Sequence, residues 1–143
     1  MTVSFNNLCL NIMDDNSNNN AIEIIITKAM MQLGFSPAFN GFYFLREAVK
    51  IAYFDEETIS LVTKLIYLPL AKEFKTTSEN IEKSIRKSAE SVWKVNSNKT
   101  VAVLNNIYTF SEKRPENNQL IKLICTFVKH AVNVFDTDIG KGI

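Results

Sequence analysis

Glycine and proline are scarce in this chain, and the scarcity limits the folds open to it. Only four glycines and three prolines occur in 143 residues. A fold made of many short strands needs frequent tight turns, and these turns depend on glycine and proline. The hydrophobic content of 46% is enough for one core, and the length does not favour two full-sized domains. We therefore expect an all-α fold, a compact bundle of six to seven helices.

The charge and the cysteine content exclude several classes of protein. The formal net charge is +1 and 22% of the residues are charged, so any basic surface must be local. Cys9, Cys125 and a single histidine cannot make a four-ligand zinc site within the chain, and we expect neither a metal nor another cofactor. We find no secretory signal and no apolar run of membrane-spanning length. A cytoplasmic protein without membrane contact is expected.

The chain divides into an N-terminal arm or linker over residues 1–20, a helical domain over 21–137 and a flexible tail over 138–143. The polar run 14–20 favours turns, and Asn20 is the expected cap of the first helix. Apolar side chains then recur at helical spacing. The expected inward sets are Ile22, Ile25, Ile26, Ala29, Met30 and Leu33 before a stop at Gly34; Phe42, Leu45, Val49 and Ala52 after Asn40 or Gly41; and Ile59, Val62, Leu65 and Ile66 after Asp55.

The second half of the domain continues this pattern. A short helix opens at Pro69, a longer one ends at Trp93, residues 94–99 break it, and another short helix covers 100–107. The last helix opens at Pro115. The expected inward sets are Leu70, Ala71 and Phe74; Ile81, Ile85, Ala89 and Val92; Val101, Leu104 and Ile107; and Leu120, Leu123, Ile124, Phe127, Val128, Ala131 and Phe135.

Residues 69–93 have the shape of a helix-turn-helix. A short helix, the tripeptide Lys75-Thr76-Thr77 and a longer amphipathic helix follow one another. The face opposite the apolar stripe carries the side chains expected to read base edges. Arg86 has a fork that fits guanine, Lys83 can enter the same groove, and Glu82 can accept a hydrogen bond from a cytosine amino group.

A second set of residues is suited to the phosphate backbone. Thr76, Thr77 and Ser78 lie where hydroxyls and free N–H groups at a helix start can hold a phosphate, and Lys87 and Lys94 supply positive charge. Most amphipathic surface helices also carry a charged stripe. The spacing alone therefore leaves two interpretations open, a DNA-reading face and an ordinary solvated one.

A longer stretch resembles a known family. Its parts are YFLREA, IYLPLAKEF, the Thr76-Thr77 turn and IEKSIR ahead of Trp93, with a weaker match in RPENNQLI. Together they resemble the C-terminal effector domain of the stage-zero sporulation protein A family of response regulators. The resemblance implies a helical, winged-helix-like domain without a clear wing. It also implies a transcriptional regulator that binds short DNA boxes, often as head-to-tail pairs.

The resemblance places four residues on the groove side of the family's recognition helix: Glu82, Lys83, Arg86 and Lys87. Two of them depart from the family. Lys83 stands where the family usually has arginine, and Lys87 where it often has histidine. Because arginine and lysine differ in forked hydrogen bonding, we expect an altered or relaxed base preference.

The front of the chain departs further from the family. The family's regulator carries a phosphoacceptor receiver domain, for which 143 residues leave no room, so we expect regulation without phosphorylation. The run LCLNIMDDN, with Asp14 and Asp15, resembles the first strand and acidic pair of that domain. Two interpretations stay open with equal weight, a receiver remnant and a chance acidic pair in a polar linker.

The partners follow from this hypothesis. We expect double-stranded DNA, with RNA polymerase, the full-length sporulation regulator and a second copy as further candidates. The alternative function is a protein-interaction module that antagonises or modulates the full-length regulator or RNA polymerase. The missing receiver, the low net charge and the glutamates on the reading face favour it. No catalytic motif occurs, and His130 has no acidic partner at ligand spacing, so we expect no enzyme.

Overall fold

The structure is a computed structural model that describes the backbone of residues 15–105 and 114–141, and the side chains of 19–95 and 114–133. Within those ranges the backbone is helical and no strand occurs, which confirms the all-α prediction. The elements are α2 (Asp15–Gln32), α3 (Asn40–Phe54), the 3-10 segment η1 (Glu56–Leu61), the π segment η2 (Thr63–Tyr67), α4 (Leu68–Glu73), α5 (Ser78–Asn105) and α6 (Asn117–Lys141).

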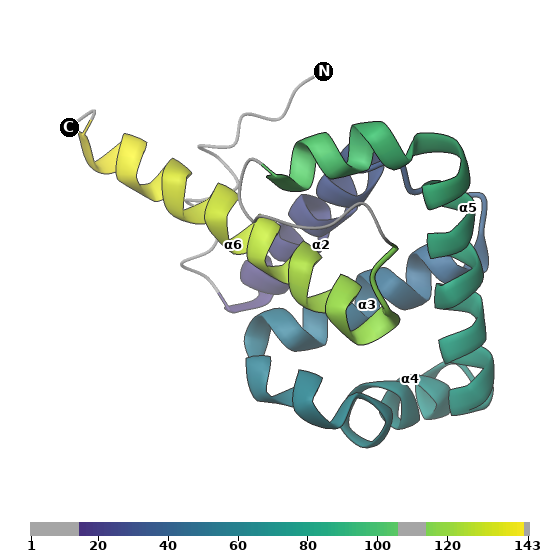
Figure 1. Ribbon diagram of the computed structural model, residues 1–143. Coiled ribbons are helices and arrows are strands. Elements are labelled where there is room, and N and C mark those ends of the chain that lie inside the picture. Colours follow the sequence, from purple (N-terminus) through teal and green to yellow (C-terminus); the bar gives the residue numbers. More distant parts are fainter. Residues whose placement is uncertain (1–14, 106–113, 142–143) are drawn as a thin grey trace.

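Helix α3 lies at the centre of the bundle and contacts α2, α5 and α6 (Figure 1). The apolar stripes predicted for α2 and α3 are buried, which confirms both. Helix α2 ends as expected at Gly34, whose φ of 103° lies in the left-handed region that glycine tolerates. There the N–H of Phe35 donates to the Met30 carbonyl and the N–H of Gly34 to the Met31 carbonyl, which is a Schellman cap.

The contact between α3 and α5 is close at Gly41. A Cβ atom added there would overlap the Ser84 carbonyl oxygen and lie 2.9 Å from Ser88 Cβ. Ser88 is buried, although it is polar. The two backbones approach this closely because neither helix carries a large side chain at the crossing. Gly41 therefore sets the distance at which α5 packs on the core.

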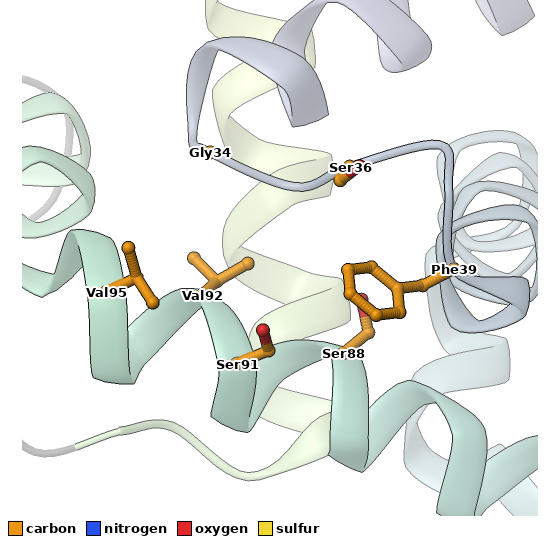
Figure 2. A pocket seen from close by; sticks show the side chains of 7 residues that line it. All are labelled: Gly34, Ser36, Phe39, Ser88, Ser91, Val92 and Val95. Atoms are coloured by element: carbon orange, nitrogen blue, oxygen red, sulfur yellow. The ribbon is translucent and has the colours of Figure 1, made fainter.

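A shallow hollow of about 180 Å³ lies next to this crossing. Figure 2 shows the connector from Gly34 to Phe39 on one side, and Ser88 and Val95 among the α5 side chains on the other. Phe39 points toward α5 and is exposed. A second hollow of about 250 Å³ is lined in part by Gly41, Ser84 and Lys87. Phe39 and Ser88 line both hollows, so the close contact at Gly41 lies next to open space.

Two predicted boundaries are wrong. Helix α2 begins at Asp15 and includes Asn20, which was expected to cap it. The buried face that starts at Ala21 stabilises the helix more than the low propensity of the polar run weakens it. Helix α5 does not stop at Trp93 but continues to Asn105, and its ribbon changes direction partway along (Figure 1). The expected helix over 100–107 is the end of α5 as far as residue 105, and residues 106 and 107 lie outside the described ranges.

The segment after Asp55 also differs from the prediction. Asp55 caps it, since its carboxylate accepts a hydrogen bond from the Glu57 N–H, but a 3-10 and a π segment follow instead of an α-helix. These pitches turn different side chains inward. Thr58 and Ile66 are buried, whereas Leu65 is exposed. Ile59 and Val62 are half-buried.

Helix α6 agrees with the prediction over its described side chains. Pro115 is buried two residues before the helix begins at Asn117. Leu120, Leu123, Ile124 and Val128 are buried, while Phe127 and Ala131 are half-buried. Phe135, Val101, Leu104 and Ile107 belong to the part of the chain whose side chains are not described.

Candidate nucleic-acid interface

Helix α4, the turn after it and the start of α5 form the predicted helix-turn-helix. Pro69 lies in the first turn of α4, and Leu70 and Ala71 are buried as expected. Phe74 was expected inside, but it is exposed and packs edge-to-face on Phe44, with ring centroids 5.3 Å apart. Because α4 ends at Glu73, the side chain of Phe74 follows the turn rather than the helix face.

The turn reverses the chain through a single left-handed residue. Lys75 has a φ of 55°, and the Thr76 N–H donates to the Ala71 carbonyl at 2.9 Å. Left-handed backbone costs a non-glycine residue some free energy, and this hydrogen bond offsets part of it. The turn thereby places Thr77 at the start of α5.

Thr76 and Thr77 both take part in starting α5. Thr77 Oγ1 accepts the Asn80 backbone N–H at 3.1 Å, and Thr76 Oγ1 accepts the Asn80 side-chain amide at 2.7 Å. Each hydroxyl uses its oxygen in these contacts, so its proton stays available to donate. Thr77 is exposed, and Thr76 and Ser78 are half-buried.

The inner face of α5 is buried as predicted. Ile81, Ile85, Ala89 and Val92 are all buried against the core. Ser88 is buried with them, a position that the hydrophobic pattern did not indicate. The opposite face of α5 is therefore turned away from the core.

That outer face is not a simple row of free cations. Arg86 Nη1 lies 2.9 and 3.0 Å from the two carboxylate oxygens of Glu82. Arg86 Nε lies 3.9 Å from Glu90 Oε1. The Arg86 side chain is 42% exposed, so this pairing is reached by solvent. Both partners stand four residues from Arg86, a spacing that predicts ion pairs on a helix and was visible in the sequence.

The beginning of α6 is joined to α5 by a buried hydrogen bond. Asn117 is buried, and its side-chain amide donates to the Glu82 backbone carbonyl at 2.9 Å. Nearby, burial raises the pKa of Tyr67; the Asn117 side chain opposes this effect and the Glu82 carboxylate adds to it. Neither Tyr67 Oη nor Asn117 Oδ1 has a hydrogen-bond partner within the described residues. The hydrophobic pattern gave no sign of Asn117, because a buried amide at a helix start looks like any polar residue.

Residues 26–128 match a family model described as Sporulation initiation factor Spo0A C terminal. The match covers more than two thirds of the 143 residues. The chain belongs to this family. Spo0A C-terminal domains are helical DNA-binding domains of sporulation regulators and not an enzyme family. The match spans the helix-turn-helix and the first part of α6, as far as residue 128, so the resemblance seen in the sequence is confirmed.

In this Spo0A C-terminal domain, α5 is the helix that carries the predicted reading residues. Lys83 and Lys87 are exposed, and so is Lys94, which lies about two helical turns after Lys87. At 100° per residue these three lysines fall within about 40° of one another around the helix axis. The structure thus places Lys83, Lys87 and Lys94 on the exposed side of α5, and the half-buried Glu82 and Arg86 lie between these lysines and the buried stripe.

The residues considered for other chemistry lie elsewhere. His130 is exposed on α6. Cys125 is buried, and burial raises the pKa of its thiol, which disfavours the reactive thiolate. Among the described side chains, no three His, Cys, Asp or Glu residues gather to hold a metal ion. None of the described helices combines the length and the apolar character needed to cross a membrane. Cys9 and Asp14 lie outside the described residues.

Proposed function

We propose that this chain is a sequence-specific transcriptional regulator that inserts α5 into the DNA major groove. The supporting observation is the division of α5 into a buried stripe around Ile85 and an outer face that holds the exposed Lys83 and the half-buried Arg86. A helix of this kind fits the major groove, and its long side chains reach the base edges. Lys83 and Arg86 read guanine edges, and Glu82 accepts from a cytosine amino group.

The phosphate contacts come from two places, the start of α5 and two lysines further along the helix. Thr76, Thr77 and Ser78 donate hydroxyl or backbone protons at the start of α5, where the helix dipole favours an anion. Lys87 and Lys94, which lie close together around the helix axis, bind phosphates further along the duplex backbone. These contacts fix the position of the domain on the duplex without reading its sequence.

DNA binding by this chain requires no phosphorylation in our proposal. Every proposed contact comes from α5 and the turn before it, and the described contacts of Ile85, Gly41 and Asn117 hold that helix in place. Protein treated with a small phosphoryl donor should bind DNA with the same affinity as untreated protein. A difference between the two would contradict this part of the proposal.

Selection of bound duplexes from a random-sequence library tests the main proposal. We expect one short sequence to be enriched, and fluorescence anisotropy to show tighter binding to it than to a scrambled duplex across a salt series. Failure to enrich any sequence, or equal affinity for both duplexes, would reject sequence-specific binding.

Two variants separate base contacts from phosphate contacts. Arg86→Ala should weaken binding to the selected duplex about 5- to 150-fold and relax the preference at one base pair, since a forked contact discriminates by about 1–3 kcal/mol. Lys87→Ala should weaken binding to both duplexes alike and lower the salt slope by about 1. If the two variants behave the same, their roles are assigned wrongly.

Binding as a pair is part of the proposal. One domain contacts few phosphates, and two copies on adjacent sites would raise the affinity at cellular salt. Sedimentation of the protein with a selected duplex should show two chains per duplex. One chain per duplex at saturation would reject pairing.

One observation favours the second candidate, a module that modulates the full-length regulator or RNA polymerase by protein contact. Glu82 and Glu90 neutralise Arg86 in the free protein. If that pairing persists, the face is poorly suited to phosphate. This function predicts that the purified chain retains the full-length regulator or polymerase on a column while it shifts no duplex in a gel.

A further inference from the structure

The hydrogen bonds of Arg86 leave one edge of its guanidinium open. Both bonds to Glu82 start from Nη1, and among the described residues Nη2 donates no hydrogen bond. A guanidinium needs two neighbouring N–H groups to fork onto a guanine, and the Nε–Nη2 edge supplies such a pair. Glu82 therefore orients Arg86 without using the edge that reads a base.

Glu90 is the group that can close this edge. Its carboxylate oxygen Oε1 lies 3.9 Å from Arg86 Nε, which is beyond hydrogen-bond distance but within an ion pair. The same oxygen lies 4.0 Å from Arg114 Nη2. Glu90 is thus shared almost equally between two arginines. A small shift toward Arg86 would occupy Nε and block the fork.

Arg114 is held in place to compete for Glu90. It precedes α6, its side chain is 29% exposed, and its Nη1 donates to the Pro115 carbonyl at 3.3 Å. The neighbouring Asn117 ties the start of α6 to the Glu82 carbonyl. Arg114 and the reading helix are therefore fixed relative to each other by a second contact three residues away.

We propose that Arg114 is a positioning residue for DNA readout: it draws the Glu90 carboxylate from Arg86 and keeps the Nε–Nη2 edge open for a guanine. The inference rests on the proposed function, because it assumes that Arg86 reads a base. It adds a residue outside the helix-turn-helix to the determinants of specificity. Arg114 acts through Glu90 and does not itself touch the base.

A double-mutant cycle measured by anisotropy tests this role. Arg114→Gln should weaken binding to the selected duplex about 3-fold, the range of an exposed ion pair, and should change binding to the scrambled duplex less. In a Glu90→Gln background the same substitution should have no selective effect, since no carboxylate remains to close the edge. Arg114→Lys, which keeps the charge near Glu90, should retain most of the preference and guards against a folding defect.

Lys122→Gln is the matched control, because it removes one exposed positive charge from α6. It should weaken both duplexes to the same small extent. The inference is overturned if Arg114→Gln behaves like this control, which would indicate a direct phosphate contact. It is also overturned if the selective loss persists with Glu90→Gln, which would mean that Arg114 affects the base preference without acting through Glu90. If the unmodified protein itself shows no preference between duplexes, the proposed function has failed, and the inference fails with it.

Discussion

The two faces of α5 are held by different kinds of force. On the inner face Ile85 is fully buried and Gly41 of α3 meets the Ser84 carbonyl without space for a methyl group. On the outer face Arg86 and Glu82 pair within reach of solvent. Burial and close packing contribute several times more free energy than exposed ion pairs. The inner face therefore fixes where the helix lies, and the outer face can change its chemistry with little effect on the fold.

Ile85→Ala should produce the largest loss of stability on this helix. It removes a fully buried side chain at the centre of the inner stripe, and such truncations cost about 2–5 kcal/mol. Urea unfolding monitored by circular dichroism measures the change. Val95→Ala is the control on the same helix, because Val95 is 74% exposed, and it should change the free energy of unfolding by less than about 0.5 kcal/mol. Equal losses for the two variants would contradict the contrast between the faces.

Gly41→Ala should have the next largest effect. The new methyl group would overlap a backbone carbonyl, which cannot move aside as a flexible side chain can. We expect α3 and α5 to separate slightly at a cost of about 1–3 kcal/mol, measured by thermal unfolding. Asn40→Ala is the control at the neighbouring exposed position. A stabilised Gly41→Ala variant would show that the helix propensity gained by alanine exceeds the cost of the contact.

The sequence predicted the inner face better than the contacts around it. The stripe of Ile81, Ile85, Ala89 and Val92 could be inferred because burial on one side of a helix repeats every 3.6 residues. The same reasoning fails after Asp55, since η1 and η2 have other pitches and leave Leu65 exposed. Periodicity assumes one helical geometry.

Contacts between segments that are distant in the sequence could not be predicted either. Asn40 or Gly41 was expected to start a helix, but the role of Gly41 as a spacer depends on Ser84, which only the folded chain brings near. The bond from Asn117 to Glu82 joins residues 35 positions apart. The pairing of Arg86 with Glu82 is different, because it follows from local spacing. The ion pair between two of the predicted reading residues thus follows from local spacing, while the contacts between distant segments that position α5 do not.

Thr77→Ala should reduce the stability less than the inner-face variants do and more than a change on the outer face. Thr77 caps α5 through the Asn80 N–H, and loss of such a cap costs about 1 kcal/mol. Thr77→Ser keeps the capping oxygen and should retain most of the stability. Thermal unfolding of the two variants measures the difference. If both lose the same amount, the methyl group of Thr77 rather than its hydroxyl stabilises the helix start.

Glu82→Gln should have the smallest effect on stability of these variants, but it should change DNA binding. The Glu82 carboxylate is partly exposed, so losing its pair with Arg86 should cost less than about 0.5 kcal/mol. The bond from Asn117 goes to the backbone carbonyl of residue 82, which the substitution leaves in place.

In the Glu82→Gln variant Arg86 would be free to bind any phosphate. Affinity for a scrambled duplex should therefore rise more than with Glu79→Gln, which removes the same charge from the same helix. Stability is measured by urea unfolding and binding by anisotropy. A loss above about 1 kcal/mol would mean that the outer face also stabilises the fold, and equal binding by the two variants would mean that only net charge matters.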